Sequence, residues 1–334
     1  MNSAYIELTT TCNLRCRTCF NSSGERIAEI PANSLGNIIE TLTAIGVGRF
    51  IFAGGEPLLY SSFSEVLRII ETRPDLQFVT STNGTVPNHN FTRAFHSCDN
   101  LNLQVSLDGS NEKINALTRG AKTFDKVMGF LSHLRTDKKK PRLKMVISKY
   151  NLTDVEDFYR LALSLKCIPE FAFVSKLGRA QQNWNDIALT DSEKVGVVKL
   201  IDQLNMETRT GINIPLCASS CPLADNSAER SYYIDVHGDV FPCQTALSDM
   251  FKLGNVFSFD KDSFDARFSQ VQQLAKTREN VDIGCASCFL GETCKRGCMA
   301  EAYFLCGDPL ANDGNCGFRK KLVLQDIKSS LFAD

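Results

Sequence analysis

The chain has 334 residues, of which 43% are hydrophobic, and a formal net charge of −1 at pH 7. This length allows one large domain or two, and the balanced charge gives no reason to expect a nucleic acid or an anionic membrane as a partner. No apolar run approaches the length of a membrane span, and no signal peptide precedes the first predicted strand. The fourteen cysteines are therefore expected to bind metal or act in catalysis in a reducing, cytoplasmic setting.

Strand and helix patterns alternate from residue 1 to about residue 210. Apolar stretches predict six strands, at residues 5–8, 49–53, 77–81, 101–107, 143–148 and 171–175. Apolar residues recur at helical spacing between them, and capping-box patterns at 153–156 and 190–193 predict the starts of two helices. Such alternation is typical of a parallel sheet with crossover helices.

Six strand–helix units are fewer than the eight that close a standard TIM barrel. We therefore expect an open, partial (β/α)6 TIM-like barrel over residues 1–210, with a wide mouth at the carboxyl ends of its strands. A small cysteine-rich α+β domain is expected over residues 211–334.

The first predicted strand is followed by Cys12, Cys16 and Cys19 in a C-x3-C-x2-C pattern. Three thiolates on one short loop can bind three irons of a cubane cluster, whereas iron–sulfur clusters normally take four cysteines. The remaining iron would be open, which is typical of a metal site that does chemistry. A zinc loop is the alternative, although zinc loops usually come as two cysteine pairs.

The second predicted strand runs directly into Gly54, Gly55, Glu56 and Pro57. Glycines let the backbone approach a ligand closely, and Glu56 offers a carboxylate to a cationic group. A simple turn is the alternative, but a neighbouring open cluster favours a binding function.

Cysteines become dense after residue 210. They are Cys217, Cys221, Cys243, Cys285, Cys288, Cys294, Cys298, Cys306 and Cys316. The stretch before Cys243 predicts a hairpin that turns at His237 and Gly238. Eight thiolates would suffice for two fully ligated cubanes or for two zinc sites, and their spacing alone does not decide between the two.

Taken together, these motifs resemble the radical S-adenosylmethionine (SAM) enzymes of the SPASM-domain branch, over essentially the whole chain. The resemblance implies that Cys12, Cys16 and Cys19 hold the SAM-binding cluster and that residues 54–57 bind the methionyl amino group. Further SAM contacts are implied for Asn83, Ser106, Asp108 and Arg119.

The same resemblance implies two auxiliary clusters, which makes three [4Fe-4S] clusters in all. The first auxiliary cluster would be held by Cys217, Cys221, Cys243 and Cys298. The second would be held by Cys285, Cys288, Cys294 and Cys316.

The implied reaction begins with cleavage of SAM to a 5′-deoxyadenosyl radical, which abstracts hydrogen from an unactivated C–H bond. The expected substrate is a ribosomally made peptide that is crosslinked, epimerised, excised or oxidised, with the auxiliary clusters accepting the electron. The implied partners are a reductant such as flavodoxin or ferredoxin and, because the chain begins at its first strand, a separate small leader-peptide-binding protein. The alternatives are a small-molecule dehydrogenase or epimerase, for example on an aminosugar in antibiotic biosynthesis, and a non-enzymatic metal-binding scaffold.

Some residues fall outside this pattern. Sulfatase-maturing relatives carry an aspartate where this chain has Gln244, so oxidation of serine or cysteine to formylglycine is disfavoured. Cys98 and Cys167 are expected to be small buried hydrophobes, whereas Cys306 could donate a hydrogen atom or replace a cluster ligand. The possible acid–base groups near the auxiliary clusters are Tyr232, Tyr233, Asp225, Asp235 and Glu292.

Overall fold

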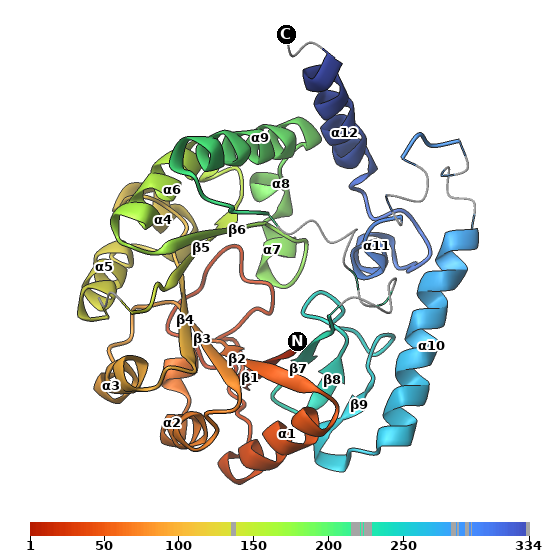
Figure 1. The fold of residues 1–334 in the computed structure, drawn as a ribbon. Helices are drawn as coiled ribbons and strands as arrows, with labels where there is room; N and C mark the ends of the chain where they lie inside the picture. Colours follow the sequence, from red (N-terminus) through yellow and green to blue (C-terminus); the bar gives the residue numbers. More distant parts are fainter. Residues whose placement is uncertain are drawn as a thin grey trace.

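The computed structural model describes residues 1–134, 138–214, 221, 223, 229–281, 285, 287–290, 294 and 296–331. Within these residues one curved sheet holds nine strands in the order β6-β5-β4-β3-β2-β1-β7-β8-β9 (Figure 1). Six strands follow the chain as parallel neighbours: β1 (Asn2–Thr9), β2 (Val47–Gly54), β3 (Gln77–Thr82), β4 (Leu101–Ser106), β5 (Arg142–Ile147) and β6 (Ile168–Phe173). The predicted open, partial barrel is confirmed.

Helices form an outer ring around this curved sheet (Figure 1). Those of the barrel are α1 (Ala32–Ala44), α2 (Phe63–Thr72), α3 (His89–Ser97), α4 (Glu112–Arg119), α5 (Phe124–His133), α6 (Val155–Ser164), α7 (Arg179–Gln182), α8 (Trp184–Ile187) and α9 (Asp191–Thr208). Those of the C-terminal part are α10 (Lys261–Asn280), α11 (Met299–Cys306) and α12 (Cys316–Leu331). None of the helices within the described residues combines the length and apolar content that a membrane span needs.

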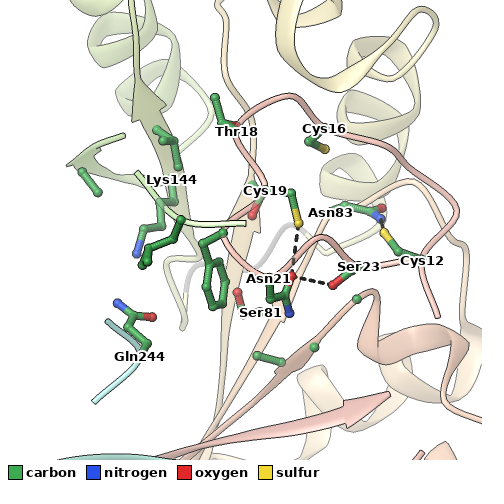
Figure 2. Close-up of a pocket in the computed structure, with 18 of the residues that line it drawn as sticks. Cys12, Cys16, Thr18, Cys19, Asn21, Ser23, Ser81, Asn83, Lys144 and Gln244 are labelled. Atoms are coloured by element: carbon green, nitrogen blue, oxygen red, sulfur yellow. Dashed lines mark hydrogen bonds between the residues drawn. The ribbon is translucent and has the colours of Figure 1, made fainter. Parts of the chain in front are cut away.

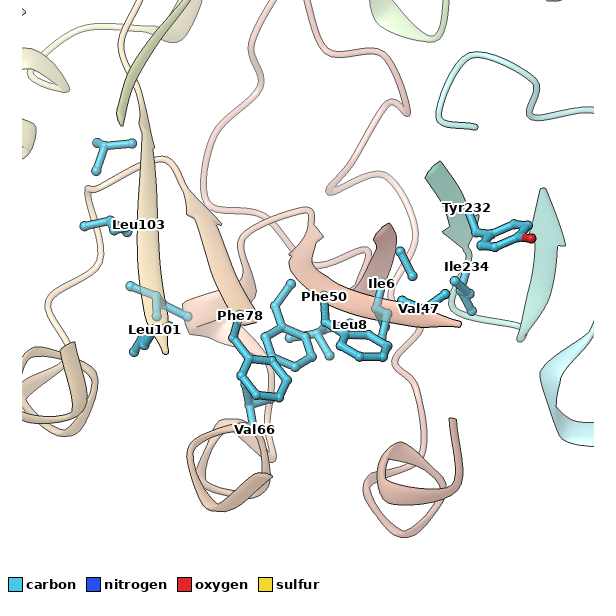
Figure 3. Close-up of a cluster of buried hydrophobic side chains, with 14 of the residues drawn as sticks. Ile6, Leu8, Val47, Phe50, Val66, Phe78, Leu101, Leu103, Tyr232 and Ile234 are labelled. Atoms are coloured by element: carbon cyan, nitrogen blue, oxygen red, sulfur yellow. The ribbon is translucent and has the colours of Figure 1, made fainter. Parts of the chain in front are cut away.

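The core lies between the sheet and the helices (Figure 3). On β1, Ile6 and Leu8 are fully buried in this layer, so the alternation of side chains along a strand sends Tyr5 and Glu7 to the barrel interior. Phe50 and Phe78, on neighbouring strands, stack with ring centroids 5.9 Å apart. The apolar layer thus fixes the strands, and the opposite face of the sheet is left for polar side chains.

The C-terminal part continues the sheet of the barrel. β7 (Ser231–Ile234) runs parallel to β1, and β8 (Asp239–Phe241) and β9 (Gly254–Asn255) follow as antiparallel strands. The predicted hairpin is confirmed, with Gly238 in the left-handed region at φ +81°. The division into domains at residue 210 stays a prediction, and it falls between segments that share one sheet.

Of the two predicted capping boxes, only one forms. At the start of α9, the Thr190 hydroxyl accepts from the Glu193 backbone N–H, and the Glu193 carboxylate accepts from the Thr190 backbone N–H, as predicted. The box at residues 153–156 is wrong, because a short 3₁₀ turn precedes α6 and no side chain caps that helix. Its Asp154 instead accepts hydrogen bonds from the backbone N–H and hydroxyl of Ser110, both at 2.6 Å.

Candidate functional site

A pocket opens at the carboxyl ends of the parallel strands, where barrels of this kind carry their active sites. The three cysteines of the loop after β1, Cys12, Cys16 and Cys19, line the pocket together with Gly54 and Gly55 at the end of β2 (Figure 2). The segments that were predicted to form the site from separate parts of the chain therefore meet in one place.

The two glycines are needed because the cysteine loop passes directly over the end of β2. The backbone N–H groups of Gly55 and Glu56 donate to the carbonyl oxygens of Thr9 and Thr11, at 2.7 and 2.8 Å. A Cβ on Gly55 would overlap the Thr11 carbonyl, and Gly54 has φ +135°, which strains any other residue. The glycines therefore allow the cysteine loop to lie close against the end of β2.

Glu56 lies beneath the pocket wall. Its carboxylate is fully buried and accepts hydrogen bonds from the Thr82 hydroxyl at 2.6 Å and the Asn83 backbone N–H at 2.7 Å. Burial raises the pKa of Glu56 to about 7, against the lowering effect of these hydrogen bonds. The carboxylate that was expected to face a cationic ligand is therefore turned toward β3, where it orients the backbone of Asn83.

Asn83 lines the pocket and links it to the cysteine loop. Its side-chain N–H donates to the Asn13 side-chain oxygen at 2.9 Å, and its own side-chain oxygen accepts from the Thr85 backbone N–H at 2.9 Å. With Glu56 below and Asn13 beside it, Asn83 has a fixed orientation. Such preorganised polar groups bind a ligand without first having to be ordered.

Arg119 and Asp108 form a buried pair on the opposite wall. The Arg119 Nε atom lies 2.9 Å from an Asp108 carboxylate oxygen, which also accepts from the Thr118 hydroxyl at 3.0 Å, and the other oxygen accepts from the Val146 N–H at 2.9 Å. Burial acts to lower the pKa of Arg119, but the Asp108 carboxylate together with Cys16 and Cys19 more than offsets it, so the pKa of Arg119 is raised. Arg119 therefore presents a permanent positive charge to the pocket.

The residues predicted to contact SAM separate into two groups. Five of them line the pocket: Gly54, Gly55, Asn83, Ser106 and Arg119. Glu56, Pro57 and Asp108 belong to the wall behind it, where Glu56 and Asp108 support Asn83 and Arg119.

In the absence of metal, burial keeps the thiols of Cys12 and Cys16 protonated. Burial raises the pKa of Cys16 to about 11 and also raises the pKa of Cys12. Cationic metal ions overcome such a rise, because a coordinating thiol is deprotonated outright. Within the part of the chain that the structure describes, no three histidine, cysteine or acidic side chains converge on one metal ion.

Arg179 holds the cysteine loop from the opposite side of the barrel mouth. Its guanidinium donates to the carbonyl oxygens of Cys16 and Ser23, each at 3.0 Å, and its backbone N–H donates to the Cys19 carbonyl at 2.9 Å. A Cβ on Gly178 would overlap the Phe20 carbonyl, so the turn before α7 packs directly on the loop. Sequence reasoning missed Arg179, because its partners lie far away along the chain.

The C-terminal cysteines are only partly described, and Cys217 lies outside the described residues. Burial raises the pKa of Cys243 to about 11, and the nearby Cys221 thiol adds to the rise. Cys294 and Cys316 lie close enough to Arg319 to raise its pKa further. Cys221 and Cys243 belong to one predicted ligand set, and Cys294 and Cys316 belong to the other.

The two sets approach each other around Arg278, which is buried, and Arg319, which is partly buried. Burial lowers the pKa of Arg278, and the nearby Cys285 and Cys298 act in the opposite direction. The backbone N–H of Cys298 donates to Asp313 at 2.9 Å, and Asp313 also binds Arg319. The remaining predicted ligand, Cys288, is a half-buried free thiol.

The remaining cysteines and the candidate acid–base residues are spread over the chain. Cys167 is buried and Cys98 packs half-buried against the core, whereas Cys306 is exposed at the end of α11 and does not line the pocket. The structure also separates the two tyrosines of β7, because only Tyr233 lines the pocket. Asp225 and Glu292 lie outside the described residues.

Comparisons with known proteins agree with this geometry. Residues 6–162 match the model of the radical SAM superfamily. Mycofactocin maturase MftC of Mycobacterium ulcerans is 28% identical over 308 residues, which cover 89% of this chain and 83% of that relative. MftC of Mycolicibacterium smegmatis is 29% identical over 316 residues, which cover 89% and 78% of the two chains.

Solved structures share the fold. Native anSMEcpe with bound AdoMet superposes with a TM-score of 0.78 at 17% identity and covers 98% of both chains. Streptococcus suis SuiB bound to S-adenosylmethionine superposes with a TM-score of 0.75 at 17% identity, covering 93% of this chain and 75% of that one.

Proposed function

Because residues 6–162 match the model of the radical SAM superfamily, we propose that this chain is an enzyme that modifies a ribosomally made peptide. It uses SAM and an iron–sulfur cluster, as its family does. The relatives MftC, matched over 89% of this chain, are named mycofactocin maturases. Chains of the same fold have been solved with peptides, SuiB with its precursor peptide SuiA and anSMEcpe with the Cp18Cys peptide.

The observation that carries this proposal is the convergence of the cysteine loop with Gly54, Gly55, Asn83 and Arg119 in one pocket. Cys12, Cys16 and Cys19 would each hold one iron, which leaves the fourth iron for the amino and carboxylate groups of SAM. When bound, the cluster and SAM supply a 5′-deoxyadenosyl radical that removes a hydrogen atom from an unactivated C–H bond. Arg119 is placed to bind an anionic or hydroxyl group of SAM, and Asp108 holds it there.

The chain itself contributes rigidity and shielding. Arg179 fixes the cysteine loop by hydrogen bonds to its carbonyl oxygens. Glu56 fixes the backbone at the end of β3. Binding groups held in this way confine a reactive species to one orientation, which is what the protein adds to cofactor chemistry.

Phe20, Tyr233, Gln244 and Thr245 line a part of the pocket that the predicted SAM contacts do not use. We assign this part to the peptide. Gln244 has no ionisable group, so it cannot act as the base that formylglycine formation needs. Crosslinking, epimerisation, excision and other oxidations remain within the proposal.

The proposal includes two auxiliary clusters, held by the two C-terminal ligand sets, and the domain division at residue 210. It also includes flavodoxin or ferredoxin as the electron donor, a separate small leader-peptide-binding protein and a cytoplasmic location.

Anaerobic reconstitution with iron and sulfide tests the proposal. Wild type should bind about twelve irons per chain, as three cubanes require, and should form 5′-deoxyadenosine only with dithionite. The variant in which Cys12, Cys16 and Cys19 are all changed to alanine should lose about four irons and all 5′-deoxyadenosine. Cys98→Ala is the matched control and should retain both. Abundant zinc with about four irons would contradict the auxiliary clusters, and tight metal binding without SAM cleavage would identify a scaffold instead.

A further inference from the structure

The charged side chains that line the pocket are all cationic. They are Arg119, Lys144 and Arg179, and within the described residues no aspartate or glutamate lines the pocket with them. Arg119 pairs with Asp108 behind the wall and belongs to the predicted SAM contacts. Arg179 pairs with Glu25 and holds the cysteine loop. Lys144 is the member of this set that neither the cysteine loop nor the predicted SAM contacts use.

Lys144 points into the barrel from the middle of β5. Leu143 and Met145, its neighbours in the chain, are fully buried in the apolar core, so strand alternation sends Lys144 to the barrel interior. Its partner in register on β4 is Ser106, which also lines the pocket. Because Lys144 lines the pocket and 21% of its side chain is exposed, a ligand in the pocket can contact it.

The acid that pairs with Lys144 is shared with a second cation. The Lys144 ammonium lies 3.0 Å from one carboxylate oxygen of Glu170 on β6, and the Arg142 guanidinium lies 3.6 Å from the other oxygen of the same carboxylate. One carboxylate thus pairs with two cations, which leaves one positive charge in excess. A lysine ammonium has three N–H donors, so the ion pair with Glu170 fixes the position of Lys144 and leaves donors for a ligand.

The excess charge determines which ligand group suits Lys144. An anionic group is attracted by the excess positive charge and meets no acidic side chain among the described residues of the lining. The carboxylate of SAM, its anionic group, is already assigned to the open iron of the cluster. Figure 2 shows Lys144 and Gln244 on the same side of the pocket, away from Cys12. Gln244 belongs to the part assigned to the peptide, so the peptide is the expected source of the anion.

We propose that Lys144 binds a carboxylate of the peptide substrate, either the C-terminus or the side chain of an aspartate or glutamate, and so selects peptides that carry this group. This inference rests on the proposed peptide-modifying function. A hydrogen bond between an ammonium and a carboxylate is about twice as strong as a neutral one. Lys144 therefore determines substrate specificity and takes no part in cluster or SAM binding.

The other cation of this group provides a matched control. Arg142 lies on the same face of β5, two residues before Lys144, and pairs with the same Glu170. It does not line this pocket. Arg142→Met therefore removes a positive charge and a partner of Glu170 without changing the pocket wall, whereas Lys144→Met removes the charge from the pocket. Lys144→Arg keeps a cation at that position.

The test measures anaerobic binding of a synthetic peptide, with the sequence of a short open reading frame beside the gene, to reconstituted protein with SAM. The peptide is made in three forms: unchanged, with an amidated C-terminus, and with asparagine and glutamine in place of its acidic residues. Wild type should bind the unchanged form about ten- to hundredfold more tightly than the form that lacks the recognised carboxylate, as expected for one charged hydrogen bond. The form that loses affinity identifies which carboxylate is bound. Lys144→Met should bind all three forms equally weakly, Lys144→Arg should keep part of the preference, and Arg142→Met should keep all of it.

Equal affinity of wild type for all three forms would overturn the inference, whether or not Lys144→Met folds, and would leave the proposed function intact if the peptide is modified. The wild-type preference in Lys144→Met would overturn it as well. Weaker binding of SAM by Lys144→Met, with the peptide preference unchanged, would assign Lys144 to SAM instead.

Turnover of the same preparations separates this inference from the proposed function. If wild type binds the peptide with the expected preference and cleaves SAM but leaves the peptide unchanged, the proposed function fails and the carboxylate site stands. If wild type does not bind the peptide in any form, both are overturned.

Discussion

Glu56→Gln tests whether the carboxyl group beneath the pocket is neutral near neutral pH. Burial raises the pKa of Glu56 from 4.5 to about 7 in the folded chain. In the unfolded chain the group ionises near its ordinary value. Folding stability that depends on Glu56 is therefore fully present below pH 4.5 and is lost as the pH rises through 7.

The magnitude follows from the two pKa values. A rise from 4.5 to about 7 corresponds to about 3 kcal/mol, at about 1.4 kcal/mol for each pH unit. Most of it, about 2.5 kcal/mol, falls between about pH 5 and pH 8. Glutamine has nearly the same shape but does not titrate, so the stability of Glu56→Gln should lack this component. The burial of Glu7 affects both proteins alike and cancels in the comparison.

The assay is anaerobic urea unfolding of the chain before iron is added, at several values between about pH 5 and pH 8. The free energy of unfolding of wild type should fall relative to Glu56→Gln by about 2.5 kcal/mol over this range. The difference in unfolding free energy between wild type and Glu65→Gln, which removes the surface pair with Arg68, should show no such dependence on pH. A difference between wild type and Glu56→Gln that stays constant with pH would refute the reasoning, because Glu56 would then be ionised throughout.

Three further substitutions test the supports of the site. Arg179→Gln should release iron from the loop to a chelator several-fold faster than wild type, because two hydrogen bonds to loop carbonyls are lost, and Arg179→Lys should be intermediate. Gly55→Ala should lose most of the iron of the loop, because its Cβ would overlap a loop carbonyl, whereas Gly36→Ala has open space and should bind iron normally. Asp313→Asn should lower the free energy of unfolding by about 3 kcal/mol in urea titration, because Arg319 loses its buried partner.

For each of these predictions, one result would contradict the reasoning. Equal iron release from wild type and Arg179→Gln would mean that the loop is held by its own backbone. Full iron binding by Gly55→Ala would mean that the loop can move away from β2. An unchanged urea midpoint in Asp313→Asn would mean that its pair with Arg319 is as weak as a surface pair.

The sheet of the barrel could be predicted because each of its strands is a short apolar run with turn residues around it. The last of the six shows the limit of this approach. It was expected at 171–175 but spans Ile168–Phe173, and it includes Pro169. Proline lacks the N–H that a central strand needs, but β6 is the edge strand of the sheet and tolerates it. Edge position is a property of the whole fold, so the local sequence could not reveal it.

The pocket could be predicted in outline, since parallel strands bring their carboxyl ends to one edge. The directions in which individual side chains point could not be predicted. Glu56 and Asp108 accept hydrogen bonds from Thr82 and Val146, which lie on the neighbouring strands β3 and β5, and no spacing within their own segments determines this. The same holds for Arg179, whose hydrogen bond to Cys16 spans 163 residues. Strand alternation predicts that one of two adjacent tyrosines on β7 faces the pocket, but only the pairing with β1 identifies Tyr233.

Transfer of deuterium from the peptide to 5′-deoxyadenosine tests the central claim most directly. Reconstituted enzyme, dithionite, SAM and a fully deuterated synthetic peptide, with the sequence of the open reading frame beside the gene, would be incubated without oxygen. If the chain modifies a peptide by abstracting hydrogen in this pocket, 5′-deoxyadenosine should gain deuterium and the peptide should change in mass. Formation of 5′-deoxyadenosine without deuterium, from an unchanged peptide, would contradict the account.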